Sequence, residues 1–202
     1  MKPVCLVLGA GAGIGGTVAT RFAQEGYHSS LCRRSDKEGL DRLVNNIKDQ
    51  GGSANGYIMN AIEDNAIEDV ISSIESDIGP IEVLVYNLGA QTGMKLLEQT
   101  SHKEFEWGWR MASFGLFRAA KILCPLMVER GKGTFLVTSA TAAMRGNRNQ
   151  HSHAAAMAAR RMLCQSLNAE FSPQGIHITH IVVDGAVDAP DTLGKMMGPE
   201  MY

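Results

Sequence analysis

Glycines near the amino terminus have the types and spacing of a nucleotide-phosphate site. An apolar run of strand length, VCLVL, leads directly into a glycine-rich turn, and residues 14–25 then read as a helix. Glycines allow a tight turn and a close approach of the backbone to a pyrophosphate, and the N–H groups and dipole at the helix start favour its negative charge. The residues expected to contact the pyrophosphate are Gly9, Gly11, Ala12, Gly13, Ile14 and Gly15.

Two registers fit this stretch. Gly11-x-Gly13-x-x-Gly16 matches the generic dinucleotide-binding fingerprint, whereas Gly9-x-x-x-Gly13-x-Gly15 matches a wider variant. We prefer the second register, because Gly9 is the first residue after the strand and the turn must begin there. A flexible glycine loop that binds nothing is the alternative.

Two arginines after the second expected strand bear on the choice of cofactor. An acidic residue about 20 residues after the glycines holds the ribose hydroxyls in NAD-binding folds. Here the corresponding stretch reads Cys32-Arg33-Arg34, and the first acid is Asp36. Two guanidinium groups suit a 2′-phosphate through charge-assisted hydrogen bonds. The sequence therefore predicts NADP(H) in preference to NAD(H), with solvated surface arginines as the alternative.

Strands and helices must position these candidate site residues. Along the chain, apolar runs of strand length alternate with longer helical patterns. Strands are expected at residues 4–8, 27–32, 54–59, 81–86, 134–138 and 176–183. Helices are expected at residues 14–25, 36–50, 63–78 and 152–171, with one or two more within residues 96–130. This alternation predicts one α/β domain over residues 1–202, a doubly wound Rossmann fold. Its mainly parallel sheet has the strand order 3-2-1-4-5-6, with helices on both faces.

In such a sheet the ligand lies beyond the carboxyl ends of the strands. Each expected strand ends at or next to a polar residue or a glycine. These residues are Gly9, Arg33, Asn60, Asn87, Ser139 and Asp184-Gly185. Their convergence on one edge predicts a cofactor crevice.

Composition narrows the class of partner. The 202 residues are 45% hydrophobic and carry a formal net charge of −2, which allows a sizeable core and argues against a nucleic-acid or membrane-surface partner. The 19 basic residues are scattered, apart from Arg33-Arg34 and Arg160-Arg161. No signal peptide and no membrane-length apolar run is visible. Four cysteines without a CxxC pair predict reduced core thiols, and we expect a cytoplasmic protein.

Several motifs together resemble the short-chain dehydrogenase/reductase family. Gly9-x-x-x-Gly13-Ile14-Gly15 resembles its nucleotide signature, and the turn at residues 85–90 resembles its Asn-Asn-Ala-Gly turn, keeping Asn87 and Gly89. The resemblance covers residues 3 to about 190 in order and spacing. It implies hydride transfer between NADP(H) and a carbonyl or alcohol. The further cofactor contacts that it implies are Asn60, Ala61, Asn87, Gly89, Gly185 and Val187.

The catalytic residues of the family do not carry over. Family members place a serine, a tyrosine, a lysine and an upstream asparagine where this chain has Ala140, His153, Met157 and Ala112. A methionine cannot supply the charge that lowers the pKa of a phenol, and no phenol is present. His153 could act as a general acid or base, and Ser139 could hydrogen-bond a carbonyl. A His153 that faces water is the alternative, and we expect no metal, since His151 and His153 lack a third ligand.

Three functional hypotheses follow. The chain is an NADP(H)-dependent oxidoreductase of unknown substrate, or an NADP(H)-binding pseudoenzyme that serves as a sensor or partner subunit, or a structural subunit. Family members commonly dimerise through the helices after strands four and five, so a homodimer or homotetramer is expected. The resemblance also implies a substrate lid and a seventh strand, which residues 186–202 are too short to supply. We therefore expect both to be missing and the sixth strand to form an exposed edge.

Overall fold

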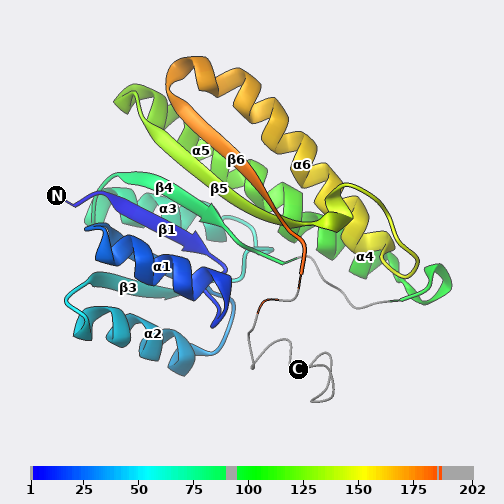
Figure 1. The fold of residues 1–202 in the computed structure, drawn as a ribbon, viewed down its shortest axis with the longest axis horizontal. Coiled ribbons are helices and arrows are strands. Elements are labelled where there is room, and N and C mark those ends of the chain that lie inside the picture. The colour runs from blue at the N-terminus through cyan, green and yellow to red at the C-terminus, as the bar shows by residue number, and fades with distance from the viewer. Residues whose placement is uncertain (1, 90–94, 186, 188–202) are drawn as a thin grey trace.

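A computed structural model describes residues 2–89, 95–185 and 187, and it shows one six-stranded sheet (Figure 1). The strand order is β3-β2-β1-β4-β5-β6, and all neighbouring strands run parallel. The strands are β1 (Val4–Leu8), β2 (His28–Arg33), β3 (Ser53–Ile58), β4 (Ile81–Tyr86), β5 (Gly133–Ala140) and β6 (Ile176–Val183). The predicted Rossmann topology is confirmed.

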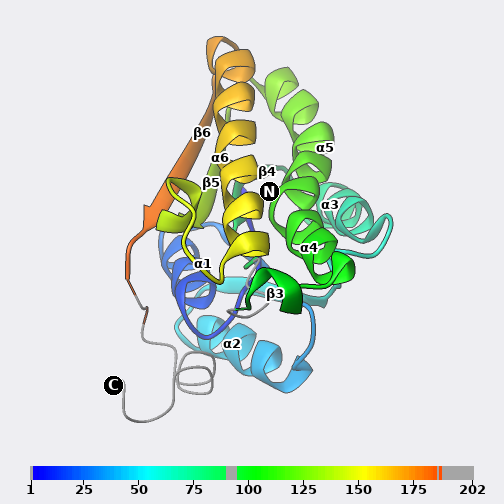
Figure 2. The same ribbon diagram turned by 90° about the vertical axis from the view of Figure 1, so that its right-hand side faces the viewer.

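Helices cover both faces of this sheet (Figure 1, Figure 2). On one face lie α1 (Ile14–Gln24) and α2 (Lys37–Asp49). On the other lie α3 (Ala66–Asp77), α5 (Gly115–Arg130) and α6 (His151–Phe171). Successive side chains of a strand point to opposite faces. Every residue of β1 is buried, because Cys5 and Val7 face the first pair of helices and the other three residues face the second set.

The expected helical region at residues 96–130 contains one continuous helix. It begins with α4 (His102–Trp109), passes through a π-helical segment (Arg110–Phe114) and continues as α5. This helix is long and apolar enough to cross a membrane, but the buried core helices of globular proteins can be equally long and apolar. Leu116, Leu123 and Met127 are buried against the sheet, as a core helix requires.

Two boundaries differ from the prediction by two residues or more. The helix expected from residue 63 begins at Ala66, because Asn65 adopts a left-handed conformation with φ 63° and starts the helix there. The fifth strand continues to Ala140, because its pairing with β6 runs on after its pairing with β4 has ended. The four cysteines are buried and unbridged, as predicted, and burial raises the pKa of Cys124 and Cys164 to about 11.

A buried ion pair joins α3 to α5. Arg118 donates from Nε to Glu68 Oε1 at 2.7 Å and from Nη1 to the carbonyl oxygen of Ala61 at 3.1 Å. Only 8% of the Arg118 side chain is exposed, and the ion pair holds the pKa of Glu68 below its ordinary value. The pair therefore fixes the segment that follows β3, where the adenine contacts are expected.

We expect Glu68→Gln to lower the free energy of unfolding at pH 7 by about 2 kcal/mol, because it leaves the Arg118 charge buried without a carboxylate. A depressed carboxyl pKa contributes stability above the unfolded-state pKa, and this stability is lost as the pH falls through the folded-state pKa. The difference between Glu68→Gln and wild type should therefore shrink below about pH 4.5. Urea denaturation at several pH values measures this, with Glu129→Gln, an exposed position on α5, as the control. An unchanged difference at pH 3.5 would contradict the assignment.

Candidate dinucleotide site

The turn after β1 is shaped by backbone contacts that require glycine. Gly9 has φ +94°, and its N–H donates to the carbonyl oxygen of Cys32 at 3.1 Å. A Cβ added at Gly9 would lie 2.6 Å from the carbonyl oxygen of Asn87, and one added at Gly15 would lie 2.2 Å from that of Gly9. The start of α1 is therefore packed directly against the turn.

Gly11 lies on the open side of the same turn. A Cβ added there would meet no atom within 4 Å, so the space beside this residue is free. The helix start nearby has Gly13 as its N-cap, without a side-chain cap for the first N–H groups of α1. Orphan N–H groups at a helix start bind anions. The open flank and the uncapped helix start fit a pyrophosphate.

Asn87 connects the ends of three strands. Its backbone N–H donates to the carbonyl oxygen of Leu8 at 2.8 Å, and its side chain donates from Nδ2 to the carbonyl oxygen of Gly9 at 2.9 Å. Thr138 Oγ1 donates to Asn87 Oδ1 at 2.7 Å. Asn87 thus ties β4 and β5 to the glycine turn, and Thr138, which sequence reasoning missed, holds it in this orientation.

The two arginines expected on a 2′-phosphate lie apart. Arg33 pairs with Asp36 at 2.9 Å and lines a cavity of about 250 Å³ beside α2, together with Arg42, Asp36 and Ala12. The Arg34 guanidinium instead lies 5.6 Å from the centre of the Trp107 ring on α4. The structure therefore brings Arg33 together with Arg42, which sequence reasoning missed. Gly39, Leu43 and Asn46 line the same cavity at helical spacing, and that pattern was the available signal.

The segment after β3 is held by the helix at residues 102–130. Arg110 Nη2 donates to the carbonyl oxygen of Ile62 and to Asp64 Oδ1, both at 3.2 Å. Asn60 Nδ2 donates to Glu63 Oε1 at 3.0 Å. The predicted contacts Asn60 and Ala61 therefore lie in a segment held by Arg110 and Arg118 of this helix and by a hydrogen bond within the segment.

An apolar cluster lies next to these strand ends. It consists of Ala112, Ala142, Ala143, Ala156 and Met157, with Ala140 and Ala154 packed against it. Ser139 is 8% exposed, and its Oγ donates to Met157 Sδ at 3.6 Å. His153 is half-buried one helical turn before Met157, so the two side chains share a face of α6. The residues of this cluster come from the π segment, from the end of β5 and the turn after it, and from α6.

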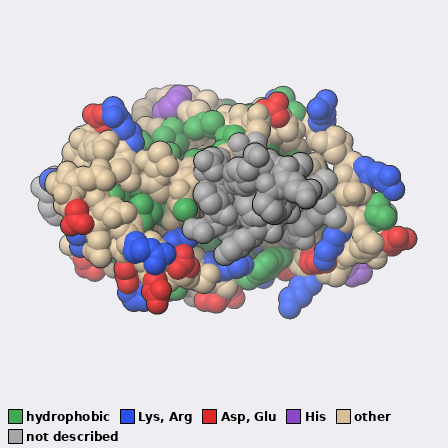
Figure 3. Space-filling model, turned by 60° about the horizontal axis from the view of Figure 1, so that its bottom comes forward, with side chains coloured by type: hydrophobic (Ala, Val, Ile, Leu, Met, Phe, Trp, Pro, Cys, Tyr) green, Lys and Arg blue, Asp and Glu red, His purple; other side chains and the backbone are tan. Residues whose placement is uncertain are grey.

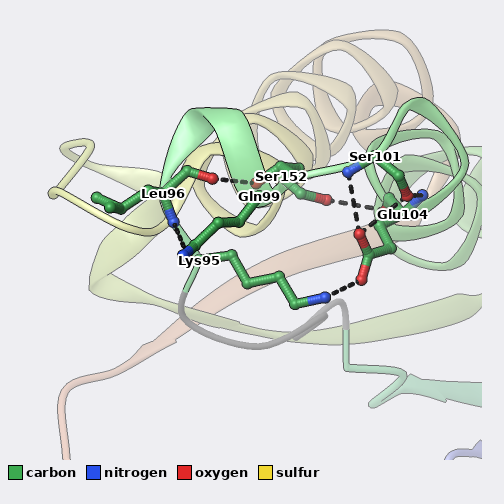
Figure 4. A network of polar contacts seen from close by, with 7 residues as sticks. Lys95, Leu96, Gln99, Ser101, Glu104 and Ser152 are labelled. Carbon is green, nitrogen blue, oxygen red and sulfur yellow. Dashed lines mark hydrogen bonds and ion pairs between the residues drawn. The ribbon is translucent and has the colours of Figure 1, made fainter.

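A polar network anchors the start of α6 (Figure 4). Ser152 Oγ donates to the carbonyl oxygen of Glu104 at 3.2 Å, and the Glu104 carboxylate accepts from Lys95 and from the Ser101 backbone N–H. These donors hold the pKa of Glu104 at about 2. The network therefore fixes the helical turn that carries His153. On the face seen in Figure 3, Lys and Arg side chains lie among Asp and Glu side chains.

Comparisons with known proteins agree with this geometry. The sequence profile of the family described as short chain dehydrogenase matches residues 3–194. The chain belongs to the short-chain dehydrogenase family. Two curated relatives are similar to it. The 3-oxoacyl-(acyl-carrier-protein) reductase of Thermotoga maritima is 28% identical over 94% of this chain and 76% of the relative. The 2,3-dihydro-2,3-dihydroxybenzoate dehydrogenase of Bacillus subtilis is 26% identical over 92% of this chain and 70% of the relative.

Solved short-chain dehydrogenases have the same fold. The enzyme from Rhodopseudomonas palustris matches with a TM-score of 0.83 at 28% identity, covering 89% of this chain and 84% of that one. The short-chain dehydrogenase from Sphingobium yanoikuyae, solved in complex with NADPH, matches with a TM-score of 0.85 at 25% identity, covering 96% and 75%. This short-chain dehydrogenase therefore shares the family's nucleotide-binding scaffold and belongs to a family of oxidoreductases.

That Ala112, Ala140, His153 and Met157 stand at the four catalytic positions of the short-chain dehydrogenase family stays a prediction. Ala112, Ala140 and Met157 come together in the apolar cluster, and His153 lies one turn away on α6. Gly89 has open space beside its Cα, and Gly185 follows β6 with φ +158°. The roles of these residues, of Ser139 and of Val187 stay predictions. Residues 90–94, 186 and 188–202 lie outside the described residues, so the expected absence of a substrate lid and of a seventh strand stays a prediction.

Proposed function

We propose that this chain is an NADP(H)-dependent oxidoreductase that transfers hydride to or from a carbonyl or alcohol. The observation that carries the proposal is the glycine turn after β1, whose open flank at Gly11 lies beside the uncapped start of α1. Family membership supports the reaction type, and the NADPH complex of the Sphingobium yanoikuyae relative supports the cofactor class.

Arg33 and Arg42 support the preference for NADP(H). They line one cavity next to the glycine turn, where paired guanidinium groups suit a 2′-phosphate. Asp36 opposes this preference, because its carboxylate pairs with Arg33 and would lie near the phosphate. The two cations outnumber the single carboxylate around this cavity.

We expect Asp36→Asn to tighten the binding of NADP⁺ by about fivefold and to leave NAD⁺ binding unchanged, because an exposed ion pair is worth at most about 1 kcal/mol. Asparagine tolerates the left-handed conformation of residue 36 and can still accept from the Gly39 N–H. Fluorescence titration with both nucleotides measures the change. Asp41→Asn, which removes the exposed ion pair with Lys37 on α2, is the control. Equal tightening of both nucleotides would place Asp36 away from the 2′-phosphate.

Different residues of the chain have different roles in the proposed reaction. A nicotinamide held in this crevice would supply or accept the hydride at its C4 position. The glycine turn would hold the pyrophosphate, Asn60, whose Nδ2 donates to Glu63 Oε1, would lie beside the adenine, and the strand ends that Asn87 connects would orient the nicotinamide half. His153 would hold or release the proton of the carbonyl oxygen, and Ser139 would hydrogen-bond that oxygen.

The apolar cluster favours a second candidate function. With alanine at the positions of the family's serine and asparagine and methionine in place of its lysine, bound NADP(H) would meet an apolar surface formed by the described residues of this cluster. The chain would then be a pseudoenzyme that reports NADP(H) as a sensor or partner subunit. Both candidate functions require dinucleotide binding, but only the oxidoreductase converts a substrate.

Titration with NADPH, followed by an assay of NADPH oxidation over a panel of carbonyl substrates, tests the proposal. Binding with turnover supports the oxidoreductase. Binding without turnover on any substrate supports the pseudoenzyme. Failure to bind NADPH or NADH removes both and leaves only a structural role.

We also propose that the chain forms a cytoplasmic homodimer or homotetramer through the helices after β4 and β5. Trp109 at the end of α4, Phe114 in the π segment and Phe117 in α5 form a stacked row, with neighbouring ring centroids 5.3 and 6.4 Å apart. Trp109 and Phe117 are exposed, as is Met162 on α6. Exposed apolar patches mark interaction surfaces. Light scattering on the purified chain measures the assembly state directly.

A further inference from the structure

Arg160 on α6 is a buried cation that the expected chemistry does not use. Only 1% of the residue is exposed, and none of the ion pairs among the described residues includes it. Burial lowers its pKa from the ordinary arginine value. Burying a charge without a partner of opposite charge is costly, so its retention here calls for a role.

The Arg160 guanidinium binds three backbone carbonyls from three segments. Nε donates to Ala112 at 2.9 Å, Nη1 donates to Thr138 at 2.6 Å, and Nη2 donates to Leu88 at 2.6 Å. The pairing of β4 with β5 ends at Tyr86 and Val137, so Leu88 and Thr138 lie beyond the last pair. The planar fork of an arginine can serve several carbonyls at once, which an ammonium group cannot match. Arg160 therefore connects the ends of the two strands where their mutual pairing stops.

Tyr86 completes this arrangement from the sheet. The Arg160 guanidinium lies 5.2 Å from the centre of the Tyr86 ring, and the Tyr86 hydroxyl donates to the carbonyl oxygen of Met111. Burial raises the pKa of Tyr86, so the phenol stays neutral and remains a donor. Two consecutive carbonyls, of Met111 and Ala112, are thus bound by side chains from β4 and α6. Side chains that insert into a helical ladder distort it, which accounts for the π segment at this place.

The same contacts reach the expected nicotinamide end of the crevice. Thr138, whose carbonyl binds Arg160, also holds Asn87 through its hydroxyl, and Leu88 lies between Asn87 and Gly89. Arg160 also lies on the face of α6 that carries His153 and Met157, at the spacing i, i+4, i+7. The cation is therefore placed directly behind the residues proposed to meet the nicotinamide half.

We propose that Arg160 is a positioning residue for the nicotinamide half of the bound dinucleotide. It acts through the three carbonyls, by fixing the ends of β4 and β5 and the π segment against each other. This inference rests on the proposed function, because it requires a dinucleotide in the crevice. The adenosine half lies at the other end, where Arg110 and Arg118 hold the segment after β3, so Arg160 should not affect it.

Binding of two ligands to Arg160→Met tests the proposal. We expect its affinity for NADP⁺ to fall about tenfold, equal to about 1.4 kcal/mol, the net value of roughly one hydrogen bond. Its affinity for adenosine 2′,5′-bisphosphate, which lacks the nicotinamide half, should stay within about twofold of wild type. Isothermal titration calorimetry measures both. Arg161→Met, which removes the neighbouring arginine, is the control and should leave both affinities unchanged.

Two milder variants keep the proposal falsifiable where Arg160→Met fails to fold. Arg160→Lys retains the charge with a smaller set of donors, and Tyr86→Phe removes only the hydroxyl that binds Met111. Each variant should lower the affinity for NADP⁺, by less than Arg160→Met does. The affinity of each for adenosine 2′,5′-bisphosphate should stay unchanged. An equal loss for both ligands, or no loss for either, would overturn the proposal. A wild-type chain that binds neither ligand would overturn the proposed function as well, which is a different result.

Discussion

His153→Ala is expected to lower the rate of carbonyl reduction about 100-fold, at the lower end of what a general acid or base contributes. His153 is half-buried on the first turn of α6, one turn before Met157, at the edge of the apolar cluster. Ser152 anchors this turn to Glu104, so the imidazole is carried by a fixed backbone. No tyrosine stands at this position to transfer the proton. The affinity for NADPH should stay unchanged, because the pyrophosphate and adenosine contacts lie on other elements.

Steady-state rates over the carbonyl panel, with NADPH affinity measured in parallel, test this expectation. His151→Ala, two residues earlier on the same helical turn, is the matched control and should retain the wild-type rate. A His153→Ala variant with the wild-type rate would assign proton transfer to water. A rate that falls together with NADPH affinity would indicate a role in binding.

Gly11→Asp is expected to weaken dinucleotide binding about 100-fold, because a carboxylate beside the pyrophosphate adds like-charge repulsion of several kcal/mol and blocks the close approach of the backbone. The fold should tolerate this change. A Cβ at Gly11 meets no atom within 4 Å, and the residue does not have the left-handed φ that favours glycine. Gly15 would be a poorer test, because its Cβ would collide with the carbonyl oxygen of Gly9. The midpoint of thermal unfolding of Gly11→Asp should therefore match that of wild type.

Gly146→Asp is the control for Gly11→Asp. Gly146 also has open space around its Cα and no left-handed φ, and it lies in the loop before α6, away from the glycine turn. Its affinity for NADPH should be unchanged. If Gly11→Asp binds NADPH as tightly as wild type, the pyrophosphate does not lie on this turn, and both candidate functions lose their main support.

The fold could be predicted because local patterns and general rules of topology agree. Each local pattern is visible within a short stretch of sequence. These patterns are the fully apolar β1, the helical spacing of apolar residues in α2 and α3, and the glycines at the turns. The rule for connecting parallel strands then leaves few strand orders. The boundaries were less accurate where a long-range contact decides them. The continuation of β5 to Ala140, for example, depends on its register with β6.

Part of the candidate site has a signature in the local sequence, whereas its supporting contacts do not. The glycine turn and Asn87 carry local signatures, whereas Thr138, Arg42 and Trp107 depend on partners far along the chain. Arg33 and Arg34 are adjacent in sequence, but Arg33 pairs with Asp36 whereas Arg34 lies over the Trp107 ring, a difference that only distant contacts reveal. Their shared role at a 2′-phosphate stays a prediction. In the sequence, Arg160 stands out only as the neighbour of Arg161 among otherwise scattered basic residues. Its helical spacing from His153 and Met157 was the one signal that could have placed it inside.

The Tyr86 hydroxyl also restricts how this chain can vary over evolution. A Cβ at Gly115 would lie 2.3 Å from that hydroxyl oxygen, so position 115 can gain a side chain only if the phenol is lost. Losing the phenol would in turn leave the Met111 carbonyl without its donor and Arg160 without the ring beside it. Homologous sequences are therefore expected to keep tyrosine, glycine and arginine at these three positions together or to replace all three, and such covariation would mark a distinct branch of the family.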